Sequence, residues 1–154
     1  MMIYYMDSSC LVKRYVNEIG SGWVLSITNP VAGNEIYTVR ITGVEVVSAI
    51  SRRKRDGTIV SADAAMVIAS LRNDLLNEYQ IIEVTEQLVN RAMALAEAYG
   101  LRGFDAVQLA GACEVQALCT ASGIPPLSFL SADRVLNAAA IAEGLSVDDP
   151  NAHP

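Results

Sequence analysis

Short apolar runs alternate along the chain with longer segments in which apolar residues recur every three or four positions. The short runs predict buried strands at 2–6, 36–39, 81–84 and 127–130, with a weaker candidate at 145–147. The periodic segments predict helices at 9–18, from Trp23 to Pro30, and at 42–55, 61–75, 85–99, 103–122 and 131–141. Because the two kinds of segment alternate, we expect an α/β fold whose parallel four- to five-stranded sheet carries helices on both faces.

The composition is that of one folded domain. The chain has 154 residues, of which 52% are hydrophobic and 18% charged, which argues against disorder and leaves little room for a second core. We assign residues 1–149 to the domain and residues 150–154 to a short polar tail. The net charge of -6 is opposite to the basic surface usual in nucleic-acid-binding domains.

Cysteine and histidine usage removes several classes of enzyme. The three cysteines form no CxxC pair, and the only histidine, His153, lies next to the C-terminal residue, where chains are usually frayed. Ser-His-Asp hydrolases, Cys-His proteases, histidine-dependent ribonucleases and HExxH metalloproteases are therefore excluded. The N-terminus lacks the pattern of a signal peptide and no apolar run approaches the ~20 residues that span a bilayer, so we expect a cytoplasmic protein without membrane contact.

Four acidic residues follow predicted strands or open predicted helices: Asp7, Glu45, Asp105 and Asp133. Each has a structural alternative, since Thr42 and Glu45 fit a capping box and an aspartate is favoured in the first turn of a helix. In a parallel α/β sheet, however, strands end and helices begin near one edge. We therefore expect all four carboxylates to lie along the carboxyl edge of the sheet.

Carboxylates gathered in one cleft repel each other unless a cation lies between them. A hard divalent cation with oxygen ligands meets that requirement, and the lack of usable histidine and cysteine ligands favours Mg²⁺ or Mn²⁺ over Zn²⁺. An all-carboxylate Mg²⁺ site is typical of phosphoryl-transfer chemistry. An aspartyl-phosphate phosphatase is disfavoured because Ser9 stands where a second acid is usual, and a phospho-receiver because both lysines, Lys13 and Lys54, come early in the chain.

Four segments in order resemble the acidic motifs of PIN-domain ribonucleases, and most of all the VapC-type toxins of toxin–antitoxin pairs. They are Ile3–Ser9 (IYYMDSS), Ile41–Ala49 (ITGVEVVSA), Leu101–Ala110 (LRGFDAVQLA) and Phe129–Asp133 (FLSAD). The resemblance extends to about Pro150, with Phe104 where tyrosine is common. It implies that residues 1–149 form a PIN-like nuclease domain in which Asp7, Glu45, Asp105 and Asp133 are the catalytic and metal-binding residues.

The resemblance also implies a function and partners. The expected activity is that of a metal-dependent endoribonuclease (a hydrolase), in which a water activated by Mg²⁺ or Mn²⁺ attacks an RNA phosphodiester. The expected partners are the RNA substrate, a cognate antitoxin that holds the enzyme inactive, and a second copy of the chain in a homodimer. Ser131 and Ser8 are expected to support the metal-binding acids. The alternative is a non-catalytic PIN-fold module that binds RNA or protein.

The remaining candidates are basic residues. The run Arg52–Arg55 suits the solvated C-terminus of a helix, where positive charge complements the dipole. Arg52 and Arg53 nevertheless fall on the same helical face as Glu45, and they are candidate RNA contacts together with Lys13 and Arg14. We expect RNA binding that is weak without metal and sensitive to salt. Trp23 fits either the core or a dimer interface.

Overall fold

The computed structural model describes all 154 residues and has five parallel strands in the order β3-β2-β1-β4-β5. The strands are β1 (Ile3–Met6), β2 (Glu35–Val39), β3 (Gln80–Ile82), β4 (Ser128–Leu130) and β5 (Ser146–Asp148). The helices are α1 (Ser8–Leu11), α2 (Ser21–Thr28), α3 (Thr42–Arg55), α4 (Ser61–Asn77), α5 (Glu86–Tyr99), α6 (Gly103–Ala121) and α7 (Arg134–Ala142). Three 3-10 helices are η1 (Val12–Arg14), η2 (Pro30–Ala32) and η3 (Pro150–Ala152). The predicted fold class is confirmed.

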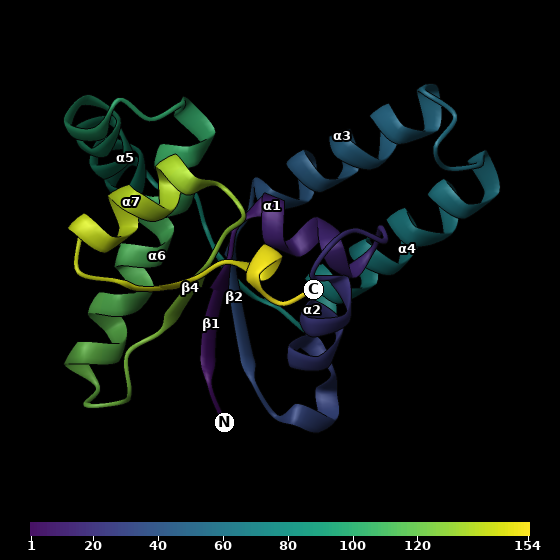
Figure 1. Ribbon diagram of the computed structural model, residues 1–154. Helices are drawn as coiled ribbons and strands as arrows, with labels where there is room; N and C mark the ends of the chain where they lie inside the picture. The colour runs from purple at the N-terminus through teal and green to yellow at the C-terminus, as the bar shows by residue number, and fades with distance from the viewer.

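Helices cover both faces of the sheet, as Figure 1 shows. Alternate side chains of β1 point in opposite directions, so that Tyr5 belongs to one hydrophobic cluster and Met6 to the other. Tyr5 packs with α5, α6 and α7, whereas Met6 packs with α1 to α4. The sheet is therefore buried on both faces, which explains why its strands are continuous apolar runs.

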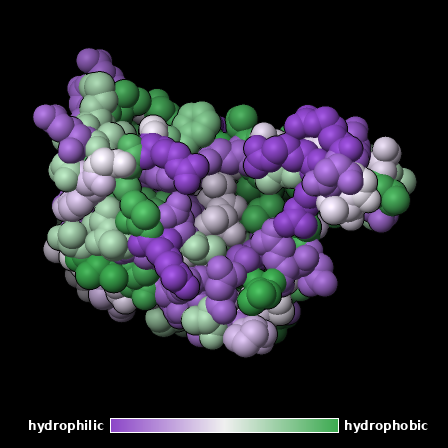
Figure 2. Space-filling view, turned by 45° about the horizontal axis from the view of Figure 1, so that its top comes forward, coloured by the Kyte–Doolittle hydropathy of each residue, from purple (hydrophilic) through white to green (hydrophobic).

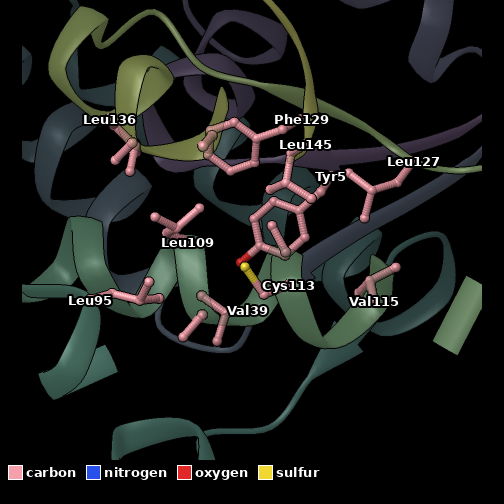
Figure 3. Close-up of a cluster of buried hydrophobic side chains, with 14 of the residues drawn as sticks. Tyr5, Val39, Leu95, Leu109, Cys113, Val115, Leu127, Phe129, Leu136 and Leu145 are labelled. Atoms are coloured by element: carbon pink, nitrogen blue, oxygen red, sulfur yellow. The ribbon is translucent and has the colours of Figure 1, made fainter. Parts of the chain in front are cut away.

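The α6 side of the core depends on a close approach between helix and sheet. Tyr5 stacks on Phe129 with ring centroids 5.7 Å apart, as seen among the side chains of Figure 3. A Cβ added to Gly111 would lie 2.6 Å from the Tyr5 hydroxyl, so only glycine fits beneath that ring. The same hydroxyl donates a hydrogen bond to Gln108 Oε1 at 3.1 Å, which fixes α6 against β1.

The expected helix over 9–18 is shorter than its periodicity indicated. It begins as α1 and tightens into η1, after which the chain turns toward α2. The Lys13 ammonium is buried beneath this turn and donates to the Ile19 carbonyl at 2.8 Å. Lys13 also pairs with Glu18 at 3.1 Å. These contacts favour a folded-back turn over a longer helix.

The C-terminal residues do not form the loose tail that the sequence indicated. Residues 150–152 form η3, and Pro150 packs so closely on Gly20 that a Cβ there would lie 2.2 Å from the Pro150 carbonyl oxygen. The His153 ring stacks on Trp23 at 4.0 Å and lies 2.9 Å from Asp148 Oδ1. Trp23 is thus a docking partner of the chain's own C-terminus.

Helices α3 and α4 project together from the body of the molecule as an arm (Figure 1). The base of the arm is anchored by Val46, Ile50 and Leu71, which are fully buried. The basic run Arg52–Arg55 occupies the last turn of α3, as predicted. The arm therefore extends one wall of the carboxyl edge well beyond the sheet.

Candidate functional site

The four predicted acids lie at the carboxyl edge of the sheet, on the elements expected for them. Asp7 directly follows β1, and Asp133 comes three residues after β4. Glu45 and Asp105 lie in the first turns of α3 and α6. Figure 2 looks onto this face, where hydrophilic side chains surround a shallow hollow between the body and the α3–α4 arm.

Asp7 is the deepest of the four, with 2% of its surface exposed. Its Oδ1 accepts the backbone N–H of Cys10 at 2.9 Å and so caps α1. Ser9 Oγ donates to it at 2.7 Å, and Ser131 Oγ donates to Oδ2 at 2.6 Å. These donors hold the carboxylate in one orientation at the end of β1.

Glu45 is held by a buried side chain instead of by its helix terminus. The expected capping box is absent: the N-cap of α3 is Ile41, with no side-chain capping bond. Instead, Gln108 Nε2 donates to Glu45 Oε1 and to Thr42 Oγ1, both at 2.9 Å. The structural alternative for Glu45 is therefore wrong.

Asp105 and Asp133 differ in what they do for their helices. Helix α6 has Arg102 as its N-cap without a side-chain capping bond, so Asp105 caps nothing. Its near neighbour is Arg102 Nε at 3.8 Å. Asp133 does cap α7, because its Oδ1 accepts the N–H groups of Val135 and Leu136 at 2.9 and 3.0 Å. Its second oxygen takes no part in these capping bonds.

Three of the acids line one open pocket of about 440 Å³, which we call the acid pocket. Its lining residues are Glu45, Arg102, Gly103, Phe104, Asp105 and Asp133. Asp7 lies outside this lining and is connected to it through Ser131, whose Oγ also accepts the Asp133 N–H at 3.0 Å. No three His, Cys, Asp or Glu side chains lie close enough together to hold a metal ion as they stand.

Burial and like charges raise the pKa of two of the acids. Burial raises the pKa of Asp7 to about 6, against the hydrogen bonds from Ser131, Ser9 and Cys10 that lower it, and the charge of Asp105 adds to the rise. The pKa of Asp105 is raised by burial and by the charge of Asp133, while Arg102 lowers it. Asp105 thus interacts by charge with the other three acids, Asp7, Glu45 and Asp133.

The serine next to Asp7 is Ser9, whereas the sequence analysis assigned a supporting role to Ser8. Ser8 begins α1 and lines a neighbouring pocket together with Ser9, but it makes no hydrogen bond to the Asp7 carboxylate. Ser9 Oγ also accepts the Ala132 N–H at 2.9 Å and so joins the loops after β1 and β4. Ser131 contacts Asp7, in agreement with its expected supporting position.

Gln108 is the residue that the sequence analysis missed. It is 1% exposed, and its amide joins Tyr5 of β1 to Glu45 of α3. The available signal was an amide three residues after Asp105, on the face of a helix that is otherwise apolar. A buried amide of that kind requires partners, and those partners lie at the site.

Three of the four candidate RNA-binding residues are engaged elsewhere. Lys13 is buried with Glu18, and Arg14 contacts Tyr79 Oη at 2.7 Å and Glu78 at 2.8 Å. Arg53 is ion-paired with Glu18. Of these four candidates, only Arg52 carries no ion pair, and it is exposed beside the site.

A second pocket of about 390 Å³ adjoins the acid pocket, and we call it the side pocket. Phe104 and Glu45 line both pockets. The other lining residues are Ser8, Ser9, Val12, Val44, Ser48, Ala49 and Arg52. The side pocket thus combines apolar walls with hydroxyl groups, one cation (Arg52) and the carboxylate of Glu45 at its border with the acid pocket.

Comparison with known proteins finds similar structures but no similar sequences. No protein-family profile matches the chain, and no curated protein is significantly similar to it. Among solved structures, PAE2754 from Pyrobaculum aerophilum matches over 99% of this chain and 94% of its own, with a TM-score of 0.63 and 18% identity. A chain of FitAcB from Neisseria gonorrhoeae matches over 97% and 98%, with a TM-score of 0.61 and 14% identity.

A third match is a chain of VapBC2 from Rickettsia felis, solved with a DNA fragment from its promoter. It covers 96% of this chain and 98% of its own, with a TM-score of 0.56 and 14% identity. At such identities the likeness concerns the fold, and it spans nearly the whole chain in each case. None of the helices combines the length and hydropathy needed to cross a membrane. The chain therefore has the fold of these solved structures over nearly its whole length, and its α/β architecture with a five-stranded parallel sheet agrees with the PIN-like domain predicted from its four motifs.

Proposed function

We propose that this protein is a metal-dependent endoribonuclease that cleaves RNA phosphodiesters by hydrolysis. The observation that carries the proposal is the pair Glu45 and Asp105. Neither carboxylate caps its helix, yet both line the acid pocket together with Asp133. The helix dipole favours an acid in each of these first turns, but it does not account for three carboxylates gathered in one pocket against their repulsion, which is typical of functional sites.

The donor set fits a hard divalent cation. The groups around the acid pocket are carboxylate oxygens, with the serine hydroxyls beside Asp7, and no imidazole or thiol is among them. We propose Asp7, Glu45, Asp105 and Asp133 as the residues that hold Mg²⁺ or Mn²⁺. Their separation in this structure means that side chains must close in on the ion. A cation bound here would acidify water and neutralise charge that develops on the phosphate.

The chain's own residues would orient these groups. Ser9 and Ser131 fix Asp7, and Gln108 directs Glu45 toward the pocket. Arg102 is 89% exposed beside Asp105, where it can reach a phosphate oxygen. The site thus offers an acidic centre for the reacting phosphate and an exposed cation for its neighbours.

We further propose that the protein is the toxin of a toxin–antitoxin pair and forms a homodimer. Structurally similar chains come from VapBC2, from FitAB bound to a DNA fragment and from a toxin–antitoxin complex of Klebsiella pneumoniae. Large apolar side chains such as Met93, Leu118 and Ile141 remain exposed and are available to a protein partner.

The test of catalysis is RNA cleavage by the purified protein, freed of any bound protein. We expect cleavage with Mg²⁺ or Mn²⁺, none with a chelator, and none for Asp7→Asn or Asp105→Asn. Asp56→Asn, an exposed acid at the end of α3, is the control and should cleave like the wild type. Equal cleavage by wild type and Asp7→Asn would overturn the site. RNA binding without cleavage would instead favour the non-catalytic binding module.

The test of the partners is independent of cleavage. The reading frame beside the gene should encode a small DNA-binding protein that copurifies with the chain and suppresses cleavage. Light scattering on the isolated chain should give the mass of a dimer. A monomer that no neighbouring gene product binds would contradict this part of the proposal.

A further inference from the structure

Phe104 is an exposed aromatic residue in an unusual position. It lies in the first turn of the 19-residue helix α6, and 57% of its surface is accessible. Exposure of a single apolar side chain is common, and what distinguishes Phe104 is that it lines both the acid pocket and the side pocket. Val44 repeats the arrangement on α3, since it directly precedes Glu45 and is 66% exposed. Glu45 and Asp105, the two acids that make no capping bond, thus each follow an exposed apolar residue.

Phe104 forms the boundary between the acid pocket and the side pocket. In the side pocket, Val12, Val44 and Ala49 provide apolar walls together with Phe104, and Ser8 and Ser48 provide hydroxyl groups. The volume of about 390 Å³ lies within the range of small-ligand sites. A flat group with apolar faces and a polar edge matches this lining, since its faces can contact Phe104 and the apolar walls while its edge meets the hydroxyl and charged groups.

We propose that Phe104 is a stacking platform and that the side pocket takes one nucleobase of single-stranded RNA, next to the phosphate held at the acid pocket. This inference rests on the proposed ribonuclease function and names the form of RNA that the site accepts. Because Phe104 and Glu45 border both pockets, a base in one and its phosphate in the other would be neighbours along one strand. Phe104 is then a substrate-positioning residue, and the acids perform the chemistry.

Stacking of this kind requires an unpaired base. In a duplex the faces of each base are covered by its neighbours, whereas single strands can turn a base onto an aromatic side chain. Such stacking contributes about 1–3 kcal/mol per base, which corresponds to about 5- to 150-fold in affinity. The side pocket therefore favours single strands, with little selection among bases by the ring itself.

Arg52 supplies a positive charge for an RNA phosphate next to the bound base. It lines the side pocket, its N–H lies 3.4 Å from Ser48 Oγ, and it carries no ion pair with an acid. Its neighbour Arg53 is paired with Glu18 and is withdrawn from the site. Arg52 is thus placed to contact an RNA phosphate next to the base bound in the side pocket.

The test compares Phe104→Leu, which keeps an apolar side chain without a ring, with Phe104→Tyr and Phe104→Trp. RNA binding is measured in the non-cleaving Asp7→Asn background with a short single-stranded oligoribonucleotide that carries 2-aminopurine. KM and kcat are measured in the wild-type background. We expect Phe104→Leu to raise Kd and KM about 5- to 150-fold with a smaller change in kcat, and to lose the quenching of 2-aminopurine. Tyrosine and tryptophan should restore both.

Two controls separate stacking from general effects. Leu76→Ala removes an exposed apolar side chain (81%) near the end of α4, outside the lining of both pockets, and should leave Kd unchanged. Replacing each nucleotide in turn by an abasic one should reveal a single position whose loss weakens binding by the wild type but not by Phe104→Leu. The matched duplex should bind more weakly than the single strand.

The outcomes distinguish this inference from the proposed function. If RNA is cleaved and Phe104→Leu matches the wild type in Kd and KM, the stacking role is wrong and the nuclease stands. If no RNA is cleaved but binding depends on Phe104 and on one base, the nuclease proposal fails and the base pocket stands. If Phe104→Leu weakens binding of a copurifying protein but not of RNA, the pocket belongs to that protein and the inference is overturned.

Discussion

The buried position of Asp7 lowers the stability of the folded protein when its carboxylate is ionised. The side chain is buried beside other acids, and its pKa is raised from 3.8 to about 6. Between those two values the folded protein binds more protons than the unfolded chain, so this group's contribution to stability falls as the pH rises from about 4 to about 6. Two pKa units correspond to about 3 kcal/mol as an upper figure. A carboxylate that opposes folding at neutral pH is consistent with a functional role.

We predict that Asp7→Asn stabilises the protein at pH 8, by about 1–3 kcal/mol, and that the gain disappears toward pH 4. The amide keeps an oxygen for the Cys10 N–H and carries no charge. The free energy of unfolding in urea, measured across this pH range, tests the prediction. The exposed Asp56 is the control, since Thr58 lowers its pKa and Asp56→Asn should give no gain at pH 8. A destabilised Asp7→Asn at pH 8 would contradict the account.

Gln108 shows what spacing in the sequence does not reveal. The four acids could be predicted because motif order and the α/β alternation place them at one edge. Gln108 stands within an apolar helix, and its significance depends on Tyr5 and Glu45, which are 103 and 63 residues away along the chain. Arg102 likewise belongs to the site only because α6 begins at the acid pocket. Contacts of this kind require the folded arrangement.

We predict that Gln108→Met, of similar size but without hydrogen bonds, lowers the apparent affinity for Mg²⁺ in cleavage about 10- to 100-fold, because Glu45 is no longer oriented. Stability should also fall, by about 1–3 kcal/mol, since Tyr5 and Thr42 lose their partner. Gln116→Met is the matched control on the same helix, because Gln116 Oε1 accepts the Leu127 N–H at 3.1 Å, away from the site. It should reduce stability and leave the Mg²⁺ dependence unchanged. A parallel effect of both variants on Mg²⁺ dependence would contradict the role of Gln108.

At the scale of elements, the sequence predicted what local chemistry determines. The helix predicted over 85–99 is α5, and the Thr85 hydroxyl caps it by accepting the Leu88 N–H. The strands likewise coincide with apolar runs, whereas α3, α4 and α6 begin without a side-chain capping bond and were predicted from their apolar periodicity. The early end of α1 and the docking of η3 were not predicted, because they depend on Lys13 and on Pro150 meeting Gly20. Those contacts join segments that carry no local signal for them.

We predict that Gly20→Ala destabilises the protein by about 2–4 kcal/mol. The alanine would be strained in the left-handed backbone conformation, and its Cβ would also clash with Pro150. Gly20 has φ +87°, and its Cβ would meet the Pro150 backbone. Gly57→Ala is the control: φ is +83° there, with nothing within 4 Å, so only the strain of about 1–2 kcal/mol applies. Urea unfolding of the two variants gives the difference. Equal losses would show that the C-terminal residues do not dock on α2 in solution.

At the scale of the whole molecule, the net charge is -6, and four of the acidic residues that produce it lie at the proposed metal site. Each divalent cation bound at the acid pocket would reduce the excess negative charge by two. The free protein therefore repels an RNA backbone at the place where the metal-loaded protein would attract it. Because Arg53 and Arg14 are paired internally, the cations left for RNA are few, and Arg52 and Arg102 flank the site from two sides.

We predict that Mg²⁺ or Mn²⁺ raises the melting temperature of the wild type at pH 8, because the ion binds only the folded arrangement of acids and relieves the repulsion around Asp105. At a hundredfold excess over Kd, binding to the folded state adds about 2.7 kcal/mol. NaCl of equal ionic strength is the control for screening and should have a smaller effect. Asp105→Asn should lose the shift, whereas Asp63→Asn, in the first turn of α4, should keep it. If Mg²⁺ leaves the melting temperature of the wild type unchanged, or shifts Asp105→Asn equally, the four carboxylates do not form a metal site.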